Sequence, residues 1–296
     1  MTKSRTVRPR SWIRAFCLFA VAPAALGSIG LGAALGAFTE DKDTRVIAYN
    51  TYGDATARCP GDKHVNFGGF KLDTQVPFGS GGYTWPASMA PKGSDTDKWS
   101  VAAEASSANG GKVTSFAYCK GGSEPKVVRH KQIVLPSAAN DEFRNVKVSC
   151  PAGKHVIGGG WAAQTSTLST QRYLEIMGLK RTSDDTWQVS VENATGVQQG
   201  VTAIALCGKG SAPKTVTATE NLPALNGSKT VTATCPTGKE AVFGGFKGDY
   251  DSLSGRNAFI FSFYLSSKRE ITVHGGQNSV AGNHAASKLQ AIAYCR

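Results

Sequence analysis

Three copies of one short stretch decide the fold: residues 59–70 read CPGDKHVNFGGF, residues 150–161 read CPAGKHVIGGGW and residues 235–246 read CPTGKEAVFGGF. Each copy begins with Cys-Pro, has a Lys four residues later and ends on Gly-Gly and an aromatic residue. A second cysteine lies 57 to 60 residues after the first cysteine of each copy: Cys119, Cys207 and Cys295. Because a sequence that returns at a regular spacing marks a repeated structural unit, we expect three homologous modules.

The sequence around these cysteines predicts β-strands and no amphipathic helix. Runs rich in β-branched and aromatic residues alternate with Gly, Ser, Asn and Pro, which is typical of strands joined by turns. The expected strands are 46–49, 83–88, 99–104 and 113–119 in the first copy, 127–135, 173–179, 187–192 and 201–207 in the second, and 215–219, 259–265, 271–274 and 289–295 in the third. The expected fold class is all-β, with antiparallel modules.

The linkers between the copies repeat as well. KGGSEPKVV follows Cys119 and GKGSAPKTV follows Cys207. Short linkers of one kind predict that neighbouring modules meet in one repeated geometry. A closed, prism-like ring with pseudo-three-fold symmetry satisfies this and hides the strand edges; separate modules on a string are the alternative. The expected modules are residues 44–122, 126–210 and 214–296.

Residues 1–37 have the composition of a secretory signal. Five Lys and Arg residues lie in the first 14 positions, and an uncharged stretch rich in Ala, Gly and Leu follows them. A basic segment, an apolar segment and small residues in this order are typical of a cleaved signal peptide; an uncleaved N-terminal membrane anchor is the alternative. We therefore expect a secreted, extracellular protein, or one anchored at the cell surface by its N-terminus.

The cysteines fit export. Cys17 lies in the leader, and the other six lie two to a repeat. An even number of cysteines in an exported chain indicates disulfides. Because each module must solve the same folding problem in the same way, we expect one bridge inside each repeat. The expected pairs are Cys59–Cys119, Cys150–Cys207 and Cys235–Cys295. Zinc ligation is disfavoured, since the sequence has no C-x-x-C motif.

The charge of the chain argues against nucleic-acid binding. The formal net charge is +12, but five of the 33 basic residues lie in the leader, so that the rest carries +7. The repeats contain no dense Lys/Arg run, whereas nucleic-acid binding requires a clustered basic face. A mildly basic surface is compatible with weak attraction to anionic cell-wall polymers.

The combined pattern C-P-x-G-K-x-V-x-G-G-G, W-x-V-x-x-x-N and V-x-A-I-A-x-C resembles the terminal β modules of actinobacterial secreted proteins and of some phage tail-fibre and collagen-like proteins. The second copy carries it in full, and the third has Ile271 in place of the Trp. The matching residues are Cys150, Pro151, Gly153, Lys154, Val156, Gly158, Gly159, Gly160, Trp187, Val189, Asn193, Ala205 and Cys207. The resemblance implies an extracellular module often placed at the tip of a trimeric stalk, here as a trimer fused into one chain, and no enzymatic activity.

The repeated glycines and aromatics are expected to be structural. A phosphate-binding loop needs G-K-[ST] at the start of a helix, and no helix is expected here. The glycines therefore indicate a bulge or a close approach of two backbones. These are Gly68, Gly69, Gly159, Gly160, Gly244 and Gly245. The aromatics are expected in the core, with a sugar-stacking role as the alternative. These are Phe70, Trp161, Phe246, Trp99 and Trp187.

One set of repeated polar residues could form a metal site. His64, His155 and Glu240 lie at equivalent positions, and two imidazoles with one carboxylate are a known metal ligand set. The alternative is three exposed polar residues on an outer strand face. We find no G-x-S-x-G or H-E-x-x-H motif, so that we expect no catalytic residues and no cofactor.

These observations favour a non-catalytic binding or adhesion protein. Recognition sites usually lie on loops held by a rigid scaffold, which indicates the variable segments 71–82, 162–172 and 247–257. The expected partner is a glycan, a cell-wall polymer or a protein. A structural component of an extracellular particle or surface layer is the alternative, and an enzyme with one site between repeats is a third.

Overall fold

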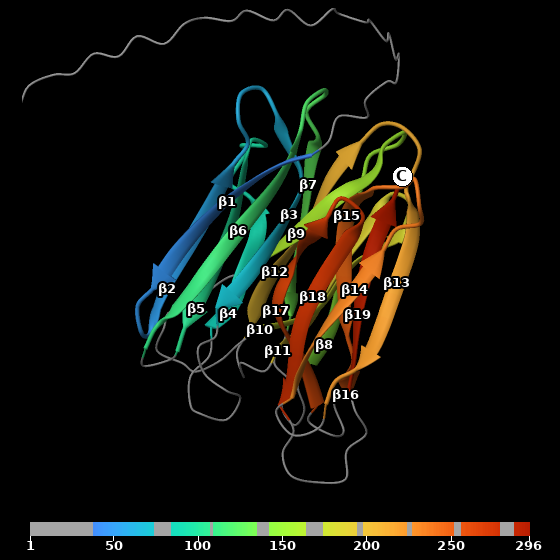
Figure 1. Cartoon of the computed structure of the whole chain (residues 1–296). Helices are drawn as coiled ribbons and strands as arrows, with labels where there is room; N and C mark the ends of the chain where they lie inside the picture. Colours follow the sequence, from blue (N-terminus) through green and yellow to red (C-terminus); the bar gives the residue numbers. More distant parts are fainter. Residues whose placement is uncertain are drawn as a thin grey trace, which may run out of the picture. The chain divides into compact units, whose positions relative to one another are not determined.

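The computed structural model describes residues 38–73, 84–106, 109–134, 142–163, 174–193, 198–223, 227–251, 256–278 and 287–296 (Figure 1). Every regular element in these residues is a β-strand, as predicted from the sequence. No helix in this part of the chain is long and apolar enough to cross a membrane. The leader, residues 1–37, lies outside the described residues.

Each repeat contributes one set of strands in the same order. Repeat 1 contains β1 (Thr39–Ile47), β2 (Thr51–Arg58), β3 (His64–Asp73), β4 (Thr84–Pro91), β5 (Lys98–Ala105) and β6 (Gly111–Lys120). Repeat 2 contains β7 (Lys126–Val134), β8 (Glu142–Ser149), β9 (His155–Ala163), β10 (Leu174–Ser183), β11 (Thr186–Asn193) and β12 (Gln199–Gly208). Repeat 3 contains β13 (Lys214–Asn221), β14 (Ser228–Thr234), β15 (Ala241–Gly248), β16 (Tyr250–Asp251), β17 (Arg256–Ser267), β18 (Glu270–Asn278) and β19 (Lys288–Cys295).

The repeats share their sheets in a closed ring. Sheet A has the order β1-β6-β3-β17-β18-β14, with β16 beside β17; sheet B is β2-β5-β4-β9-β12-β7; sheet C is β13-β19-β15-β10-β11-β8. Each sheet therefore joins three strands of one repeat to three strands of another, and repeat 3 returns to repeat 1. This is the closed arrangement that the linkers predicted. Separate modules would each have sheets of their own.

The joints between repeats are short and equivalent. Each consists of two residue pairs, one residue of each pair from either repeat, in the middle of a sheet. At each joint the aromatic residue that ends the repeated stretch pairs with an apolar residue of the preceding repeat around the ring. The pairs are Phe70–Phe263, Trp161–Met89 and Phe246–Leu179.

The Gly-Gly pair has two separate functions in packing. A Cβ on the first glycine would overlap a large side chain of the same repeat: Trp99 at Gly68, Trp187 at Gly159 and Ile271 at Gly244. A Cβ on the second would meet a carbonyl oxygen of the neighbouring repeat: Phe263 at Gly69, Met89 at Gly160 and Leu179 at Gly245. The first glycine therefore makes room for the core of its own repeat, and the second allows the joint to close.

The three repeats meet on a central axis. The side-chain amide of Asn66 donates to the carbonyl oxygens of Ile157 (3.4 Å) and Val242 (3.0 Å). These residues stand at the same place in the three copies, seven positions after the first cysteine. Contact between all three equivalent positions places the pseudo-three-fold axis beside them.

Three disulfides join Cys59 to Cys119, Cys150 to Cys207 and Cys235 to Cys295, with Cα–Cα distances of 5.5, 5.6 and 5.7 Å. These are the pairs that the repeat predicts. Each bridge joins the start of the repeated stretch to the end of the last strand of its repeat. The bridges therefore lie at one end of the sheets, which we call the disulfide end; the opposite end is the loop end.

The expected strands lack two strands of each repeat. One strand was expected before each Cys-Pro, whereas the structure has two; the missed ones are β2, β8 and β14. The strands that contain the Gly-Gly pair, β3, β9 and β15, and the short β16 were not among the expected ranges either. The first repeat also begins at Thr39 rather than at residue 44. Strand β1 lies at the edge of its sheet and has a mostly charged, exposed sequence, so that its ends give no hydrophobic signal.

Candidate functional site

The loop end gathers equivalent segments of all three repeats. Strands β3 and β9 end there, and β4, β10 and β17 begin there (Figure 1). The three predicted binding segments connect these strands. Residues 74–82, 164–172 and 252–255 of these segments lie outside the described residues. The strand ends that border them define the site.

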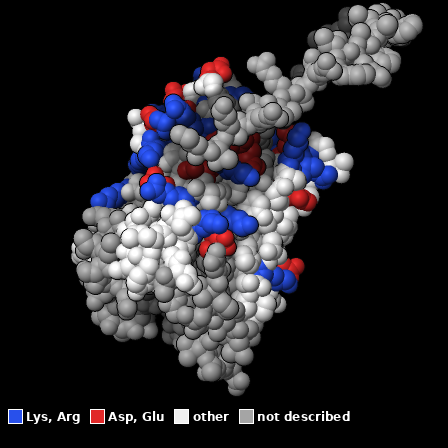
Figure 2. Space-filling model, turned by 60° about the vertical axis from the view of Figure 1, so that its left-hand side comes forward, with Lys and Arg blue, Asp and Glu red and all other residues white. Residues whose placement is uncertain are grey.

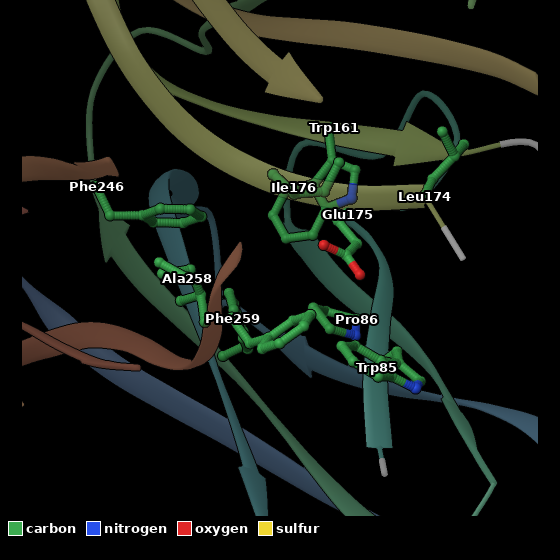
Figure 3. A pocket seen from close by; sticks show the side chains of 11 residues that line it. Trp85, Pro86, Trp161, Leu174, Glu175, Ile176, Phe246, Ala258 and Phe259 are labelled. Carbon is green, nitrogen blue, oxygen red and sulfur yellow. The ribbon is translucent and has the colours of Figure 1, made fainter. Parts of the chain in front are cut away.

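A narrow pocket of about 20 Å³ lies between these strand ends and is lined by all three repeats (Figure 3). A volume of this size admits one group about as large as a water molecule. Two sets of equivalent residues form most of the lining, one deep and one nearer to the loops. We call this site the axial pocket.

The deep set consists of the aromatics that end the three repeated stretches: Phe70, Trp161 and Phe246. All three are fully buried. The rings of Phe70 and Trp161 meet edge to face at 5.9 Å. Within the described residues the indole Nε1–H of Trp161 has no hydrogen-bond acceptor. These side chains are core residues, as predicted, and they also form the floor of a pocket.

The outer set consists of Trp85, Glu175 and Phe259, each from the strand that enters the sheet after a loop. All three are half-buried. Trp85 and Phe259 meet edge to face, with ring centroids 5.0 Å apart. Figure 3 shows the Glu175 carboxylate between Trp161 on one side and Phe259 and Trp85 on the other. The pocket thus combines aromatic faces with one carboxylate.

Exposed apolar side chains also gather at the loop end. Among the described residues, four large hydrophobic side chains are exposed: Val46 (72%), Tyr49 (59%), Tyr52 (38%) and Ile133 (49%). Val46, Tyr49 and Tyr52 lie around the β1–β2 turn, and Ile133 lies near the end of β7. Val46 pairs with the start of β6, Tyr52 with the end of β5 and Ile133 with the start of β12, and Tyr49 lies between β1 and β2. All four residues therefore lie toward the loop end.

Charged side chains lie at the disulfide end. Ion pairs there include Arg58–Asp97 (3.0 Å) and Lys98–Asp95 (2.6 Å). On the face that Figure 2 shows, the described Lys, Arg, Asp and Glu side chains lie in the upper and middle parts. Ion pairs also lie toward the loop end, namely Lys229–Glu220 (2.7 Å), Lys112–Asp73 (3.8 Å) and Lys247–Asp249 (3.9 Å), so that both ends of the sheets contain charged side chains.

The proposed metal ligands have separate partners. His64 Nδ1 lies 3.2 Å from the Thr96 hydroxyl, and His155 Nε2 lies 3.2 Å from Nη2 of Arg296. The backbone of Glu240 pairs with the backbone of Arg296. No group of three or more His, Cys, Asp or Glu residues in the described ranges is arranged to hold a metal ion.

The surroundings of His155 further disfavour a cation. Burial, and then the charges of Arg296 and Arg181, lower the pKa of its imidazole below the ordinary value. A site that already contains two guanidinium groups repels a metal ion.

Sequence reasoning did not single out Trp85, Glu175 or Phe259. Their side-chain types differ, so that they give no repeated motif. The available signal was their place: each follows a variable loop at the start of a predicted strand. The joint pairing makes them equivalent, because each lies near the start of its strand, before the joint residue. The chain matches no family model and no curated protein.

Proposed function

We propose that this chain is an exported, non-catalytic binding protein whose loop end recognises an uncharged saccharide, such as a segment of a cell-wall glycan. The observation that supports this most is the outer set of the axial pocket, which places two half-buried aromatic rings and a carboxylate beside the three loops. The three disulfides support an oxidising, extracellular environment.

The chemistry of the pocket suits a sugar. Aromatic rings offer a large apolar face with little conformational entropy to lose. The carboxylate of Glu175 accepts hydrogen bonds from hydroxyl groups, and the indole N–H of Trp161 is a donor. A pocket for one small group takes a hydroxymethyl or hydroxyl substituent, while the rest of the saccharide lies across Trp85 and Phe259.

Binding to a saccharide array, followed by calorimetry with cellohexaose, chitohexaose and soluble peptidoglycan fragments, tests the proposal. We expect Trp85→Ala and Phe259→Ala each to weaken binding by at least about tenfold, as truncation of a binding aromatic commonly does. Glu175→Gln keeps the size of the side chain and weakens binding less. Tyr264→Ala is the matched control, because Tyr264 is a half-buried aromatic of β17 beyond the joint, toward the disulfide end. Equal losses in the control, or none in the pocket variants, would contradict the proposal.

A structural or assembly role is the second candidate. It is favoured by the exposed side chains of Val46 and Tyr49, which lie close together at the β1–β2 turn. Contiguous exposed apolar surface marks a protein contact more often than a free surface. Native mass spectrometry of the wild type and of Val46→Ser/Tyr49→Ser distinguishes the two candidates: multimers that the substitutions dissociate indicate assembly, and a monomer in both indicates binding through the pocket.

A further inference from the structure

A second, larger hollow of about 530 Å³ lies on the outer face of sheet B, where β4 of repeat 1 joins β9 of repeat 2. It has a floor of small side chains and a wall that contains two cations. We call it the flank hollow, and the residues that matter for it are Ser88, Ala90, Lys92, Ser100, Arg129 and Ala162. It is separate from the axial pocket, which has a different lining.

The flank hollow exists because small residues replace long ones at two positions. Ala90 pairs with Ser100 beside the joint, and Ala162 pairs with Ser88 within it. The same ladder positions in the other two sheets have large side chains. The residues that correspond to Ala90 and Ala162 are Lys180 and Lys247 in sheet C, and Tyr264 and Lys71 in sheet A. Sheet B therefore lacks the long side chains that sheets A and C have on the outer face of their joints.

Arg129 extends across this joint from β7. Its Nη2 donates to the carbonyl oxygens of Gly93 (2.5 Å) and Pro91 (3.5 Å) in the other repeat. Two backbone carbonyls thus hold the guanidinium in place at the wall of the hollow. In the described residues Arg129 pairs with no carboxylate, and its Nε and Nη1 have no acceptor. Partial burial without an acid beside it lowers the pKa of this guanidinium, which remains charged.

The other charges of the hollow cancel. Lys92 forms an ion pair with Asp54 at 3.0 Å, and the Ser100 hydroxyl donates to the same carboxylate at 3.4 Å. This leaves Arg129 as the surplus charge. A guanidinium that is held in place and keeps free donors is suited to a charge-assisted hydrogen bond with a carboxylate or phosphate oxygen. The volume falls within the range of small-molecule sites.

We propose that the flank hollow binds the anionic group of an acidic saccharide or polyol phosphate. Nη1 of Arg129 donates a charge-assisted hydrogen bond to a carboxylate or phosphate oxygen, Ala90 and Ala162 support the ring or polyol, and the Ser88 hydroxyl bonds to a ligand hydroxyl. The site goes beyond the proposed function, because it uses another face and another chemistry.

Calorimetric titration of the disulfide-intact chain with four probes tests this site: glucuronate and glycerol 3-phosphate, with glucose and glycerol as uncharged controls. We expect at least one of the two anions to bind and the uncharged probes not to bind. If both anions bind, the site accepts any oxyanion. If only glucuronate binds, the natural group is a carboxylate, and if only glycerol 3-phosphate binds, it is a phosphate. Added sodium chloride should weaken binding, because the contact is electrostatic.

Variants localise the binding. Arg129→Gln should weaken it by at least about tenfold, the value of a charged hydrogen bond. Ala90→Tyr fills the hollow with the residue that sheet A has at the same position and should abolish binding without loss of charge. Arg129→Lys retains the charge but not the planar group that the two carbonyls hold in place, and it should be intermediate. Lys180→Gln is the matched control and should bind the anions normally. Trp85→Ala, which changes the axial pocket, should also bind them normally, so that a failure of the flank-hollow proposal can be distinguished from a failure of the loop-end proposal.

Three results would overturn the inference. The first is that neither anion binds the wild type. The second is normal binding by both Arg129→Gln and Ala90→Tyr. The third is an equal loss in Lys180→Gln, which would indicate a general effect of surface charge. Ala90→Tyr also covers the case in which Arg129→Gln fails to fold, since it leaves the Arg129 contacts intact.

Discussion

Substitution of Gly160 by Ala tests how the ring closes. A Cβ at this position would lie 1.8 Å from the carbonyl oxygen of Met89 and 2.9 Å from its carbonyl carbon. These are backbone atoms of β4, which cannot rotate away. To restore an ordinary contact of about 3.5 Å, the two strands must separate by roughly 1.5 Å. Hydrogen bonds of about 2.9 Å would then exceed the limit for a real bond.

The size of the effect follows from the joint. It consists of two residue pairs, Ser88–Ala162 and Met89–Trp161. Each buried backbone group left without a partner costs about 1–3 kcal/mol, so that Gly160→Ala should lower the free energy of unfolding by about 4 kcal/mol. This is a large part of the 5–15 kcal/mol that is typical of a folded domain. Gly159→Ala should cost less, about 1–3 kcal/mol, because its Cβ meets the side chain of Trp187 instead.

Urea denaturation of the oxidised protein, followed by circular dichroism, measures these differences. Gly121→Ala is the control, since a Cβ there meets nothing within 4 Å, and it should leave stability within about 0.5 kcal/mol of the wild type. The expected order of loss is Gly160→Ala, then Gly159→Ala, then Gly121→Ala. Equal stability of Gly160→Ala and Gly121→Ala would refute the view that backbone contact at this glycine closes the ring.

Three further predictions concern the scaffold. Replacement of Cys150 and Cys207 by Ala opens a loop of 57 residues and should lower the free energy of unfolding by about 4 kcal/mol; a loss below about 1 kcal/mol in urea denaturation would speak against it. Tyr294→Phe removes the acceptor of the Arg181 backbone N–H at 2.7 Å and should cost about 1–3 kcal/mol in the same assay, whereas an unchanged midpoint would show that this bond is replaced by solvent. Burial lowers the pKa of both His155 and His274 in the folded chain, so that the unfolded chain binds more protons below its pKa of about 6.5. Stability should therefore be complete above about pH 6.5 and fall as the pH drops below it, and His155→Gln/His274→Gln should reduce that fall; an equal fall in the double variant would exclude these histidines as its cause.

The repeat, four strands of each repeat and the disulfide pairs could be predicted from the sequence because each leaves a strong local signal. Alternation in β5, for instance, places Trp99 and Val101 in the core and Ser100 outside. Cys59 and Cys119 could be paired because each repeat must solve its own folding problem. Even the closed ring could be anticipated, since linkers of one kind require one repeated contact.

The sheet exchange could not be read from the sequence in the same way. It depends on β2, β8 and β14, whose buried residues are mostly small or few, such as Ala55 and Ala57 in β2. Small residues give a weak hydrophobic signal. Without these strands a repeat cannot be divided into the two halves that join different sheets.

The candidate site was the least visible feature. Trp85, Glu175 and Phe259 are separated by more than 80 residues along the chain, and two of them are aromatic while the third is acidic. Only the closed ring brings them together. Glycines and disulfides recur because the fold requires them in every repeat. A site on the axis occurs only once, so that each repeat can supply a different side chain to it.

Hydrogen exchange with mass spectrometry, with and without a saturating amount of the saccharide that binds most tightly in the array, tests the central claim most directly. Recognition at the loop end predicts that protection from exchange increases at the starts of β4, β10 and β17 together, in all three repeats. Protection confined to the disulfide end, or to the strands of one repeat alone, would contradict a binding site on the axis.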